Sequence, residues 1–264
     1  MNAAFEVGAA ALRAEQRALE IYANNVANVN TPAFKRTEAR FSEVLANRME
    51  ETGGIAPAAP AGTLSAGVLA QAGSGVRVTG QDMIFAQGAL RATGNALDLA
   101  IDGQGFLELM GPNGETLLWR GGRLRVNEDG LLATASGTAL RAGIIVPADA
   151  EALSISAEGI VSVRTADQEA LEIGQLDLVR VEHEGALERL DDGLFRAADG
   201  AKLIDARAGE DGAGLFAQGQ VEESNVELTE EMVRMMVVQR AFAANAQVIQ
   251  AADQFASITN SLKR

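Results

Sequence analysis

Apolar residues recur every seven positions at both ends of the chain. The two repeats consist of Phe5, Leu12, Leu19 and Val26 at the front, and of Leu228, Met235, Phe242 and Ile249 at the back. This spacing places the side chains along one side of a helix, and such a helix needs a partner to cover that side. The pattern therefore predicts two terminal helices that have no core of their own.

The first helix is expected to run from Asn2 to about Asn28. The following stretch ends it, because Pro32 cannot continue a helix and disfavours helical geometry at Thr31. Asparagines in this stretch also favour local turns over helix hydrogen bonds. A short amphipathic piece is expected next, with Phe41, Val44 and Leu45 on its apolar side.

The last helix is expected to start after Ser224 or Asn225, since both residue types are good N-caps. Several glutamates follow, which suit the positive end of the helix dipole. Apolar and small residues then alternate in steps of three and four, and this seam comprises Met235, Val238, Phe242, Asn245, Ile249, Ala252 and Ala256.

The middle of the chain is predicted to be all β. Short apolar runs are separated by the turn dipeptides Asn113-Gly114, Asp129-Gly130, Glu158-Gly159 and Asp192-Gly193. The residues around Glu158-Gly159 alternate as in a hairpin, and a further strand is expected through Leu176, Leu178 and Val181. The expected fold class is α+β, with a predominantly β central domain and terminal helices that pair as an assembly coiled coil.

Between the first helix and the β region, the chain has little bulk to bury. Residues 52–76 carry no charge and consist mostly of Ala, Gly, Pro, Ser and Thr. This composition is typical of a flexible or extended connector, although a segment that becomes ordered only against neighbouring subunits is also possible. The expected division is an N-terminal helix and helix exit at 1–36, a linker at 37–76, a β domain at 77–220 and a C-terminal helix at 221–264.

Composition restricts the classes of protein to which the chain can belong. The 264 residues are long enough for a sizeable core, and 47% of them are hydrophobic. The net charge of −14 argues against a general nucleic-acid binder. No apolar stretch is long enough for membrane insertion, and the first thirty residues do not read as a cleaved signal peptide. The absence of cysteine excludes disulfides and thiolate sites.

The sequence offers no catalytic, cofactor-binding or metal-binding constellation. His183 is the only histidine and stands in an acidic strand end or turn, so a solvated surface position is expected for it. Gly103-Gln104-Gly105 lacks the third glycine and the helix of a dinucleotide fingerprint, which makes a turn or bulge the simpler interpretation. Acidic pairs such as Asp191-Asp192 stand in polar turns and are expected to be solvated. The chain is therefore expected not to be an enzyme, and a secreted β-rich hydrolase remains as an alternative.

Three ordered strings resemble the flagellar rod and hook proteins. These are ANNVANVNTPAFKR at 23–36, TGNALDLAIDGQGF at 93–106, and VEESNV at 221–226, which is followed by RAF at 240–242 and QAADQ at 250–254. Together they span nearly the whole chain. One departure is Ala33, which stands where the family pattern usually has glycine. Within the family, the chain is most similar to the subunits of the distal rod.

The resemblance implies a structural subunit that polymerises helically into a hollow drive shaft and transmits torque to the hook. It implies export through the flagellar type III apparatus without a cleaved signal, and a periplasmic place in the basal body. The implied partners are further copies of the chain, proximal rod proteins, the hook protein and the surrounding bushing rings. A proximal rod or hook-type axial subunit is the alternative within the same family.

The resemblance also assigns roles to particular side chains. The inner tube would be built from Phe5, Leu12, Leu19, Val26, Met235, Val238, Phe242 and Ile249. The exit from the first helix would be fixed by Asn24, Asn25, Asn28 and Phe34. An isolated terminal helix is marginally stable because ordering it costs conformational entropy. The ends are therefore expected to be satisfied by contact with sister copies.

Overall fold

The computed structural model describes residues 2–43, 76–165, 170–198, 200–210 and 212–261. These residues fall into two compact units. The first unit contains residues 1–24, 37–82 and 229–264, and the second contains residues 25–36 and 83–228. This division differs from the one expected from the sequence, because the helix exit at 25–36 lies with the β domain and residues 77–82 lie with the helices.

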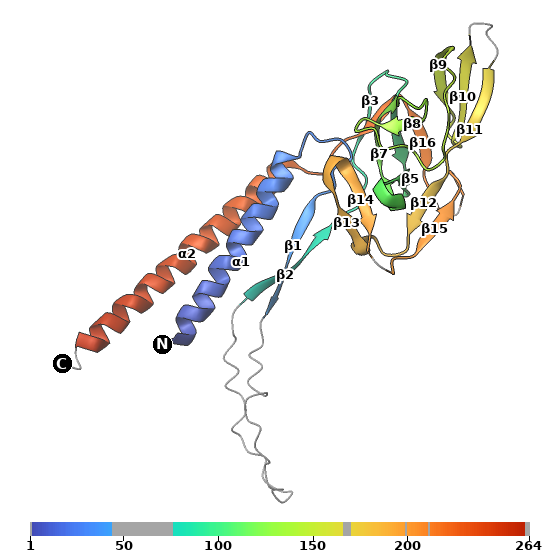
Figure 1. The fold of residues 1–264 in the computed structure, drawn as a ribbon. Helices are drawn as coiled ribbons and strands as arrows, with labels where there is room; N and C mark the ends of the chain where they lie inside the picture. The colour runs from blue at the N-terminus through green and yellow to red at the C-terminus, as the bar shows by residue number, and fades with distance from the viewer. Residues whose placement is uncertain (1, 44–75, 166–169, 199, 211, 262–264) are drawn as a thin grey trace, which may run out of the picture. The chain divides into compact units, whose positions relative to one another are not determined.

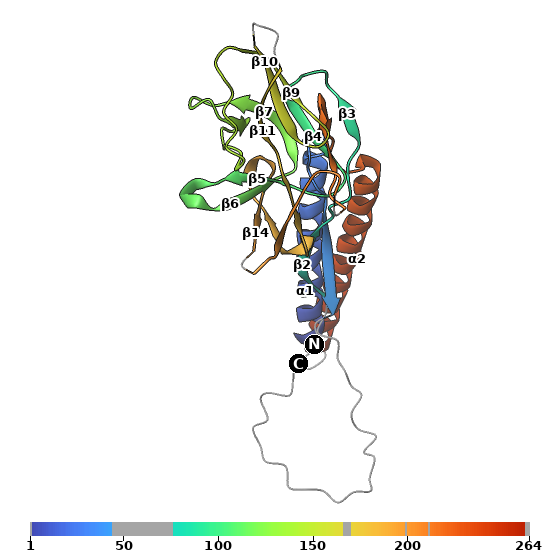
Figure 2. The ribbon, with the colours of Figure 1, turned by 90° about the vertical axis from the view of Figure 1, so that its right-hand side faces the viewer.

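The first unit is built from two long helices and a two-stranded ribbon (Figure 1). Helix α1 spans Asn2–Ala27 and helix α2 spans Leu228–Ser261. The ribbon pairs β1 (Thr37–Glu43) with β2 (Val76–Met83). The two helices lie side by side in both ribbon views (Figures 1 and 2).

A small apolar cluster joins the parts of the first unit. Ala18, Ile21 and Tyr22 of α1 pack with Ala39 of β1, and the half-buried side chains of Met235 and Val238 on α2 complete this cluster. Arg234 of α2 also forms an ion pair with Glu38 of β1, with 3.2 Å between Nη1 and Oε1. The ribbon is thus attached to both helices.

The structure corrects the expectation for residues 37–43. They were expected to belong to a linker with an amphipathic piece, but they form strand β1, and Phe41 on this strand is exposed. Backbone pairing with β2 explains the difference, because it stabilises an extended segment that has little apolar bulk of its own. Val44, Leu45 and the remainder of the expected linker up to residue 75 lie outside the described residues.

The second unit consists of short strands in several antiparallel sheets. Its strands are β3 (Leu90–Ala92), β4 (Asp98–Asp102), β5 (Leu107–Met110), β6 (Thr116–Trp119), β7 (Gly121–Val126), β8 (Leu132–Thr134), β9 (Ala150–Ile155), β10 (Ile160–Thr165), β11 (Ala170–Gln175), β12 (Leu178–Val181), β13 (Leu187–Arg189), β14 (Leu194–Ala197), β15 (Leu203–Ala206), β16 (Leu215–Gln218) and β17 (Gln220–Glu222). Single 3-10 turns occur at Pro112–Gly114, Glu184–Ala186 and Asp191–Gly193. The strand orders are β16-β4-β7-β8, β13-β14-β6-β5, β11-β10-β9, β12-β15 and β17-β3.

The predicted β character and its turns are confirmed. The hairpin around Glu158-Gly159 joins β9 to β10, with Ile155 opposite Val161 and Leu153 opposite Val163. The glycines of the four predicted turn dipeptides all have positive φ, between 71° and 90°. Glycine suits these turns because other residues rarely adopt that geometry. Of the strand expected through Leu176, only Leu178–Val181 is formed.

The core of the second unit consists of a larger, mainly aliphatic cluster that also contains Trp119 and Phe216, and of a smaller cluster with three phenylalanines. Leu99, Leu124 and Leu132 are completely buried in the larger cluster. In a second cluster, the rings of Phe85, Phe106 and Phe195 contact one another with centroid distances of 5.5 to 5.8 Å.

Candidate functional site

A cluster of buried charged residues lies in the second unit, where segments from distant parts of the sequence meet. We call Lys35, Arg120 and Glu222, together with the half-buried Asn225, the Glu222 cluster. The side chains of Lys35 and Glu222 expose 0% and 1% of their surface, and that of Arg120 exposes 5%. Charged side chains of this kind are almost never fully buried unless they are paired.

Glu222, at the end of β17, accepts hydrogen bonds on both carboxylate oxygens. Its Oε1 lies 2.5 Å from Lys35 Nζ and 3.0 Å from the backbone nitrogen of Gly88. Its Oε2 lies 3.0 Å from Arg120 Nε. Lys35 Nζ also donates to the carbonyl of Ala86 at 3.0 Å. Burial lowers the pKa of Lys35, and the negative charge of Glu222 acts in the opposite direction.

Arg120 connects this carboxylate to the turn between β4 and β5. Its Nη1 donates to the carbonyl of Gly105 at 2.5 Å, and its Nη2 donates to the carbonyl of Gly103. Both glycines have positive φ, so Gly103-Gln104-Gly105 is a turn, as the sequence indicated. The turn presents carbonyl oxygens to a guanidinium group, which is the opposite of the N–H groups that a phosphate-binding loop presents.

Asn225 binds the two segments that adjoin the ribbon. Its Oδ1 accepts a hydrogen bond from the backbone nitrogen of Arg36 at 2.7 Å. Its Nδ2 donates to the carbonyls of Ile84 and Ala86, at 2.7 and 2.9 Å. With its amide used in this way, Asn225 does not cap α2, and the helix begins at Leu228 rather than directly after Ser224 or Asn225. The expected start of the helix, at residue 225 or 226, is therefore corrected by two or three residues.

The helix exit is fixed by backbone turns and by an aromatic contact. The backbone nitrogens of Asn28 and Thr31 donate to the carbonyls of Asn25 and Asn28, both at 3.1 Å. Phe34 is buried, and the guanidinium carbon of Arg189 lies 4.0 Å from its ring centroid. A cation stacked on an aromatic face in this way is favourable. Arg189 also donates to the carbonyl of Lys35.

Of the four residues predicted at the helix exit, three are buried or half-buried. Asn25 is completely buried, Phe34 is buried against Arg189, and Asn28 Oδ1 accepts a hydrogen bond from the Thr31 hydroxyl at 3.1 Å. Asn24 is exposed. Ala33 has φ of 55° in the left-handed region, and its nitrogen donates to the carbonyl of Glu222 at 2.8 Å. The turn therefore keeps a glycine-like geometry although the residue is alanine.

The predicted helix seams are only partly covered in the single chain. Phe5, Leu12, Leu19 and Val26 are half-buried, as are Met235, Val238 and Ile249, and Phe242 exposes 37% of its surface. The more deeply buried apolar residues of α1 are Ala14, Ala18, Ile21 and Tyr22. The side chain of Ala256 lies outside the described residues.

Two contacts between α1 and α2 stand out. Asn245 Nδ2 donates to Glu15 Oε1 at 2.6 Å. A Cβ atom added at Gly8 would lie 2.8 Å from Ile249 Cγ1, so the two helices approach closely at this point. Since low residue numbers of α1 meet high numbers of α2, the two helices run antiparallel.

Sequence reasoning did not single out Lys35, Arg120 or Glu222, and it considered Asn225 only as a candidate N-cap. Lys35 lies in the first family-like string, and Glu222 and Asn225 lie in the third, so the motifs contained the signal. Arg120 lies in none of the three strings. Partners that are 102 and 187 residues apart cannot be paired from one sequence.

Comparison with known proteins identifies similar chains over the whole length. Family models match at residues 5–35 ("Flagella basal body rod protein"), 100–163 ("Flagellar hook protein FlgE/F/G D1 domain") and 217–262 ("Flagellar basal body rod FlgEFG protein C-terminal"). The chain is 35% identical to the flagellar basal-body rod protein FlgG of Caulobacter vibrioides, over 98% of this chain and 99% of the relative. It is 33% identical to the FlgG protein of Borreliella burgdorferi over the full length of both. It is also 30% identical to the flagellar basal-body rod protein FlgF of Caulobacter vibrioides, over 94% of this chain and 93% of the relative.

Proposed function

The chain belongs to the family of flagellar basal-body rod proteins, and from this premise we propose that it is the structural subunit of the distal rod. In this proposal, copies of the chain polymerise helically into a rigid, hollow shaft that transmits torque to the hook. The chain is assigned to a structural family, and we propose no catalytic role for it.

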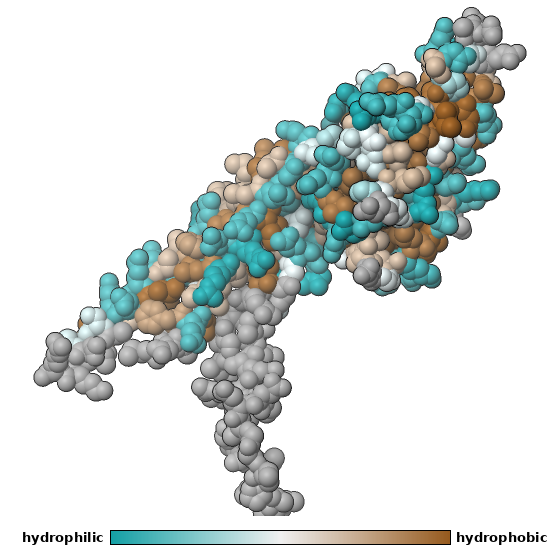
Figure 3. Space-filling model, in the orientation of Figure 1, coloured by the Kyte–Doolittle hydropathy of each residue, from teal (hydrophilic) through white to brown (hydrophobic). Residues whose placement is uncertain are grey.

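The observation that carries the proposal is a second apolar side on α2, which is largely exposed among the described residues. Val237, Val248 and Phe255 expose 61%, 65% and 68% of their surface. They belong to a series that alternates in steps of four and three, consisting of Val237, Ala241, Ala244, Val248, Ala251, Phe255 and Ile258. Figure 3 shows apolar surface along the helices of the first unit. An exposed apolar seam with this spacing is suited to packing against another helix.

The two sides of α2 suggest how the terminal helices assemble. One side contacts α1 through Met235, Val238 and Ile249, and we propose that this pair forms a coiled coil in the rod. The other side would pack against the helices of neighbouring copies. Phe5, Leu12, Leu19, Val26 and Phe242 would then lose their remaining exposure inside the inner tube, with apolar burial as the driving force.

The family supports a set of partners and a location. We propose contacts with the proximal rod proteins, the hook protein and the surrounding bushing rings. We also propose export by the flagellar type III apparatus without a cleaved signal peptide, and a periplasmic position. Within the described residues, neither helix combines the length and the apolar character needed to cross a bilayer.

A pair of neighbouring substitutions tests this proposal. Val248→Glu places a charge on the uncovered apolar side of α2, whereas Gln247→Glu places the same residue at the adjacent exposed position. Val248→Glu is expected to abolish polymers in electron micrographs and to stop motility, while the secreted monomer keeps its circular dichroism spectrum. Gln247→Glu is expected to polymerise normally. Normal rods from Val248→Glu would contradict the proposal.

The similarity to a FlgF protein supports an alternative proposal, in which the chain occupies a different position along the flagellar axis. A proximal rod or hook-type subunit would share the helices and the β unit. Labelled protein in isolated basal bodies distinguishes the positions, since a distal rod subunit is expected next to the hook and absent from the inner-membrane end.

A further inference from the structure

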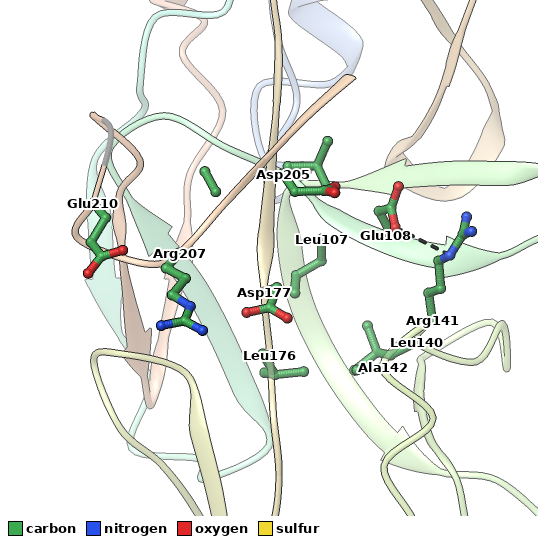
Figure 4. Close-up of a pocket in the computed structure, with 12 residues that line it drawn as sticks. Leu107, Glu108, Leu140, Arg141, Ala142, Leu176, Asp177, Asp205, Arg207 and Glu210 are labelled. Atoms are coloured by element: carbon green, nitrogen blue, oxygen red, sulfur yellow. Dashed lines mark ion pairs between the residues drawn. The ribbon is translucent and has the colours of Figure 1, made fainter. Parts of the chain in front are cut away.

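A cavity of about 520 Å³ opens on the second unit, and no residue of the Glu222 cluster is among the residues that line it (Figure 4). Its apolar lining includes Leu107, Leu140 and Leu176, which are almost completely buried. Charged residues surround this lining, and they come from β5, β15 and the loops that follow Leu140, Leu176 and Ala206. The cavity therefore combines an apolar floor with a charged rim.

The rim has an excess of negative charge. It contains four carboxylates, those of Glu108, Asp177, Asp205 and Glu210, and two guanidinium groups, those of Arg141 and Arg207. Figure 4 shows Glu108 directed toward Arg141, and the ion pair between them measures 3.4 Å. Within the described parts of the chain, Asp177 and Asp205 form no ion pair or side-chain hydrogen bond.

The surroundings of Glu108 indicate which charge the cavity favours. Burial raises the pKa of this carboxyl, the nearby Asp205 raises it further, and Arg141 acts in the opposite direction. A carboxylate that is partly buried beside another carboxylate is stabilised in its charged form when a cation lies nearby. A ligand with a cationic head and an aliphatic stem would satisfy both the rim and the leucine floor.

We propose that this cavity receives an arginine side chain from a neighbouring copy of the chain in the rod. The aliphatic stem would lie on Leu107 and Leu140, and the guanidinium would bind Asp177 and Asp205. Arginine is favoured over lysine because its guanidinium is more weakly hydrated and binds carboxylates through two parallel hydrogen bonds. This inference rests on the proposed helical polymerisation.

The same unit carries exposed arginines that could serve as the donor. Arg125 on β7 and Arg164 on β10 are exposed, and within the described residues they form no ion pair. A unit that carries an acidic cavity in one place and an unpaired arginine in another can form head-to-tail contacts. Contacts of this type produce open helical arrays when they do not close into a ring.

The proposal is tested by whether the critical concentration for polymerisation rises or falls when carboxylates are replaced by amides. Because the chain carries a net charge of −14, removing two carboxylates should in general weaken the repulsion between copies and favour polymerisation. The control double variant Glu172→Gln/Glu188→Gln, at exposed positions outside the cavity, is expected to lower the critical concentration slightly or leave it unchanged. The cavity variant Asp177→Asn/Asp205→Asn is expected to raise it by at least about threefold. If the critical concentration of the cavity variant falls as it does for the control variant, the proposal is overturned.

A small-molecule probe gives an independent readout. n-Butylguanidinium chloride is expected to shift the methyl NMR signals of Leu107 and Leu140 in the wild-type monomer and to raise the critical concentration. Tetramethylammonium chloride at equal ionic strength is expected to do neither, and Asp177→Asn/Asp205→Asn should not respond to n-butylguanidinium. Methyl shifts with calcium chloride and none with n-butylguanidinium would overturn the proposal in favour of a metal site.

The donor is identified by single substitutions in the polymer. Either Arg125→Gln or Arg164→Gln is expected to raise the critical concentration, and to add nothing when combined with Asp177→Asn/Asp205→Asn. If neither substitution raises the critical concentration, the assignment of the donor arginine is wrong. Wild-type protein that does not polymerise at all would refute the proposed function. Cavity variants that polymerise with the wild-type critical concentration would refute only this inference.

Discussion

Glu222 Oε1 lies 2.5 Å from Lys35 Nζ, and both side chains are inaccessible to solvent although 187 residues separate them. Lys35 lies near the end of the helix exit at 25–36, and Glu222 precedes the start of α2. The chain passes from one unit to the other at residues 24–25, 36–37, 82–83 and 228–229. Near the last three of these, Arg36, Ile84 and Asn225 are joined by the hydrogen bonds of the Asn225 amide. The cluster thus holds together the segments that lead to the terminal helices.

Removing Glu222 is expected to destabilise the second unit strongly. Glu222→Ala leaves Lys35 and Arg120 buried without their shared counter-ion, and breaking a buried pair typically costs about 3–5 kcal/mol. Urea denaturation of the monomer, followed by fluorescence of Trp119, measures this loss.

The adjacent Glu223 provides a matched control for this experiment. It pairs with Arg91 at 2.8 Å, but both side chains are about half exposed. Exposed pairs contribute roughly 0.2–1 kcal/mol, so Glu223→Ala is expected to have little effect. If Glu222→Ala and Glu223→Ala lower the free energy of unfolding equally, the burial of the charges around Glu222 does not explain the loss.

Ala33→Gly is expected to stabilise the protein. Ala33 has φ of 55°, a left-handed geometry that costs a residue with a Cβ roughly 1–2 kcal/mol and glycine almost nothing. The greater freedom of glycine in the unfolded chain offsets roughly 0.5–1 kcal/mol of this gain. The variant should have a higher midpoint in urea, whereas Ala96→Gly, at an exposed position without positive φ, should have a lower one. A lower midpoint for Ala33→Gly would indicate that this geometry carries no strain.

Glu15 should make the pairing of the helices dependent on pH. Burial raises the pKa of Glu15, although the hydrogen bond from Asn245 acts in the opposite direction, and Oε2 is buried without a hydrogen-bond partner among the described residues. A raised pKa means that the folded state binds the proton more tightly than the unfolded state. The stability contributed by this group is therefore complete below the usual pKa of about 4.3 and is lost as pH rises through the folded pKa.

Glu15→Gln tests this dependence, because glutamine keeps the acceptor for Asn245 without the charge. At pH 7 the variant should show a higher midpoint for thermal loss of the helical circular dichroism signal, and the difference should disappear near pH 3.5. Glu20→Gln, at an exposed position on α1, is the control and should have little effect at either pH. If the thermal midpoint of Glu15→Gln equals that of the wild type at pH 7, the ionised carboxylate of Glu15 does not destabilise the helix pair.

Gly8 is expected to be energetically coupled to Ile249. In a helix, Gly→Ala normally stabilises by roughly 1 kcal/mol, but an added Cβ at Gly8 would lie 2.8 Å from Ile249 Cγ1 and 2.9 Å from Cδ1. Gly8→Ala should therefore be neutral or destabilising in the wild type and stabilising in an Ile249→Ala background. A double-mutant cycle from thermal unfolding should give a coupling of about 0.5–3 kcal/mol, and additive effects would mean that the helices do not approach closely here.

The sequence by itself determined the features that depend on local spacing and turn chemistry. The three-and-four alternation through Met235 and Ile249 defined a helix seam, and glycines such as Gly159 marked turns where positive φ is required. The three ordered strings indicated the family and, with it, the structural role. These properties could be read from one sequence because each depends on neighbours only a few residues apart.

The tertiary structure decided the features that depend on contacts between distant residues. Thr37–Glu43 forms a strand because β2 supplies its backbone partner, and Asn225 binds Arg36 and Ile84 instead of capping α2. The burial of Lys35, Arg120 and Glu222 follows from their convergence, since an isolated charge would remain in water. The positive φ of Ala33 is likewise imposed by its surroundings, because alanine alone would favour a different turn.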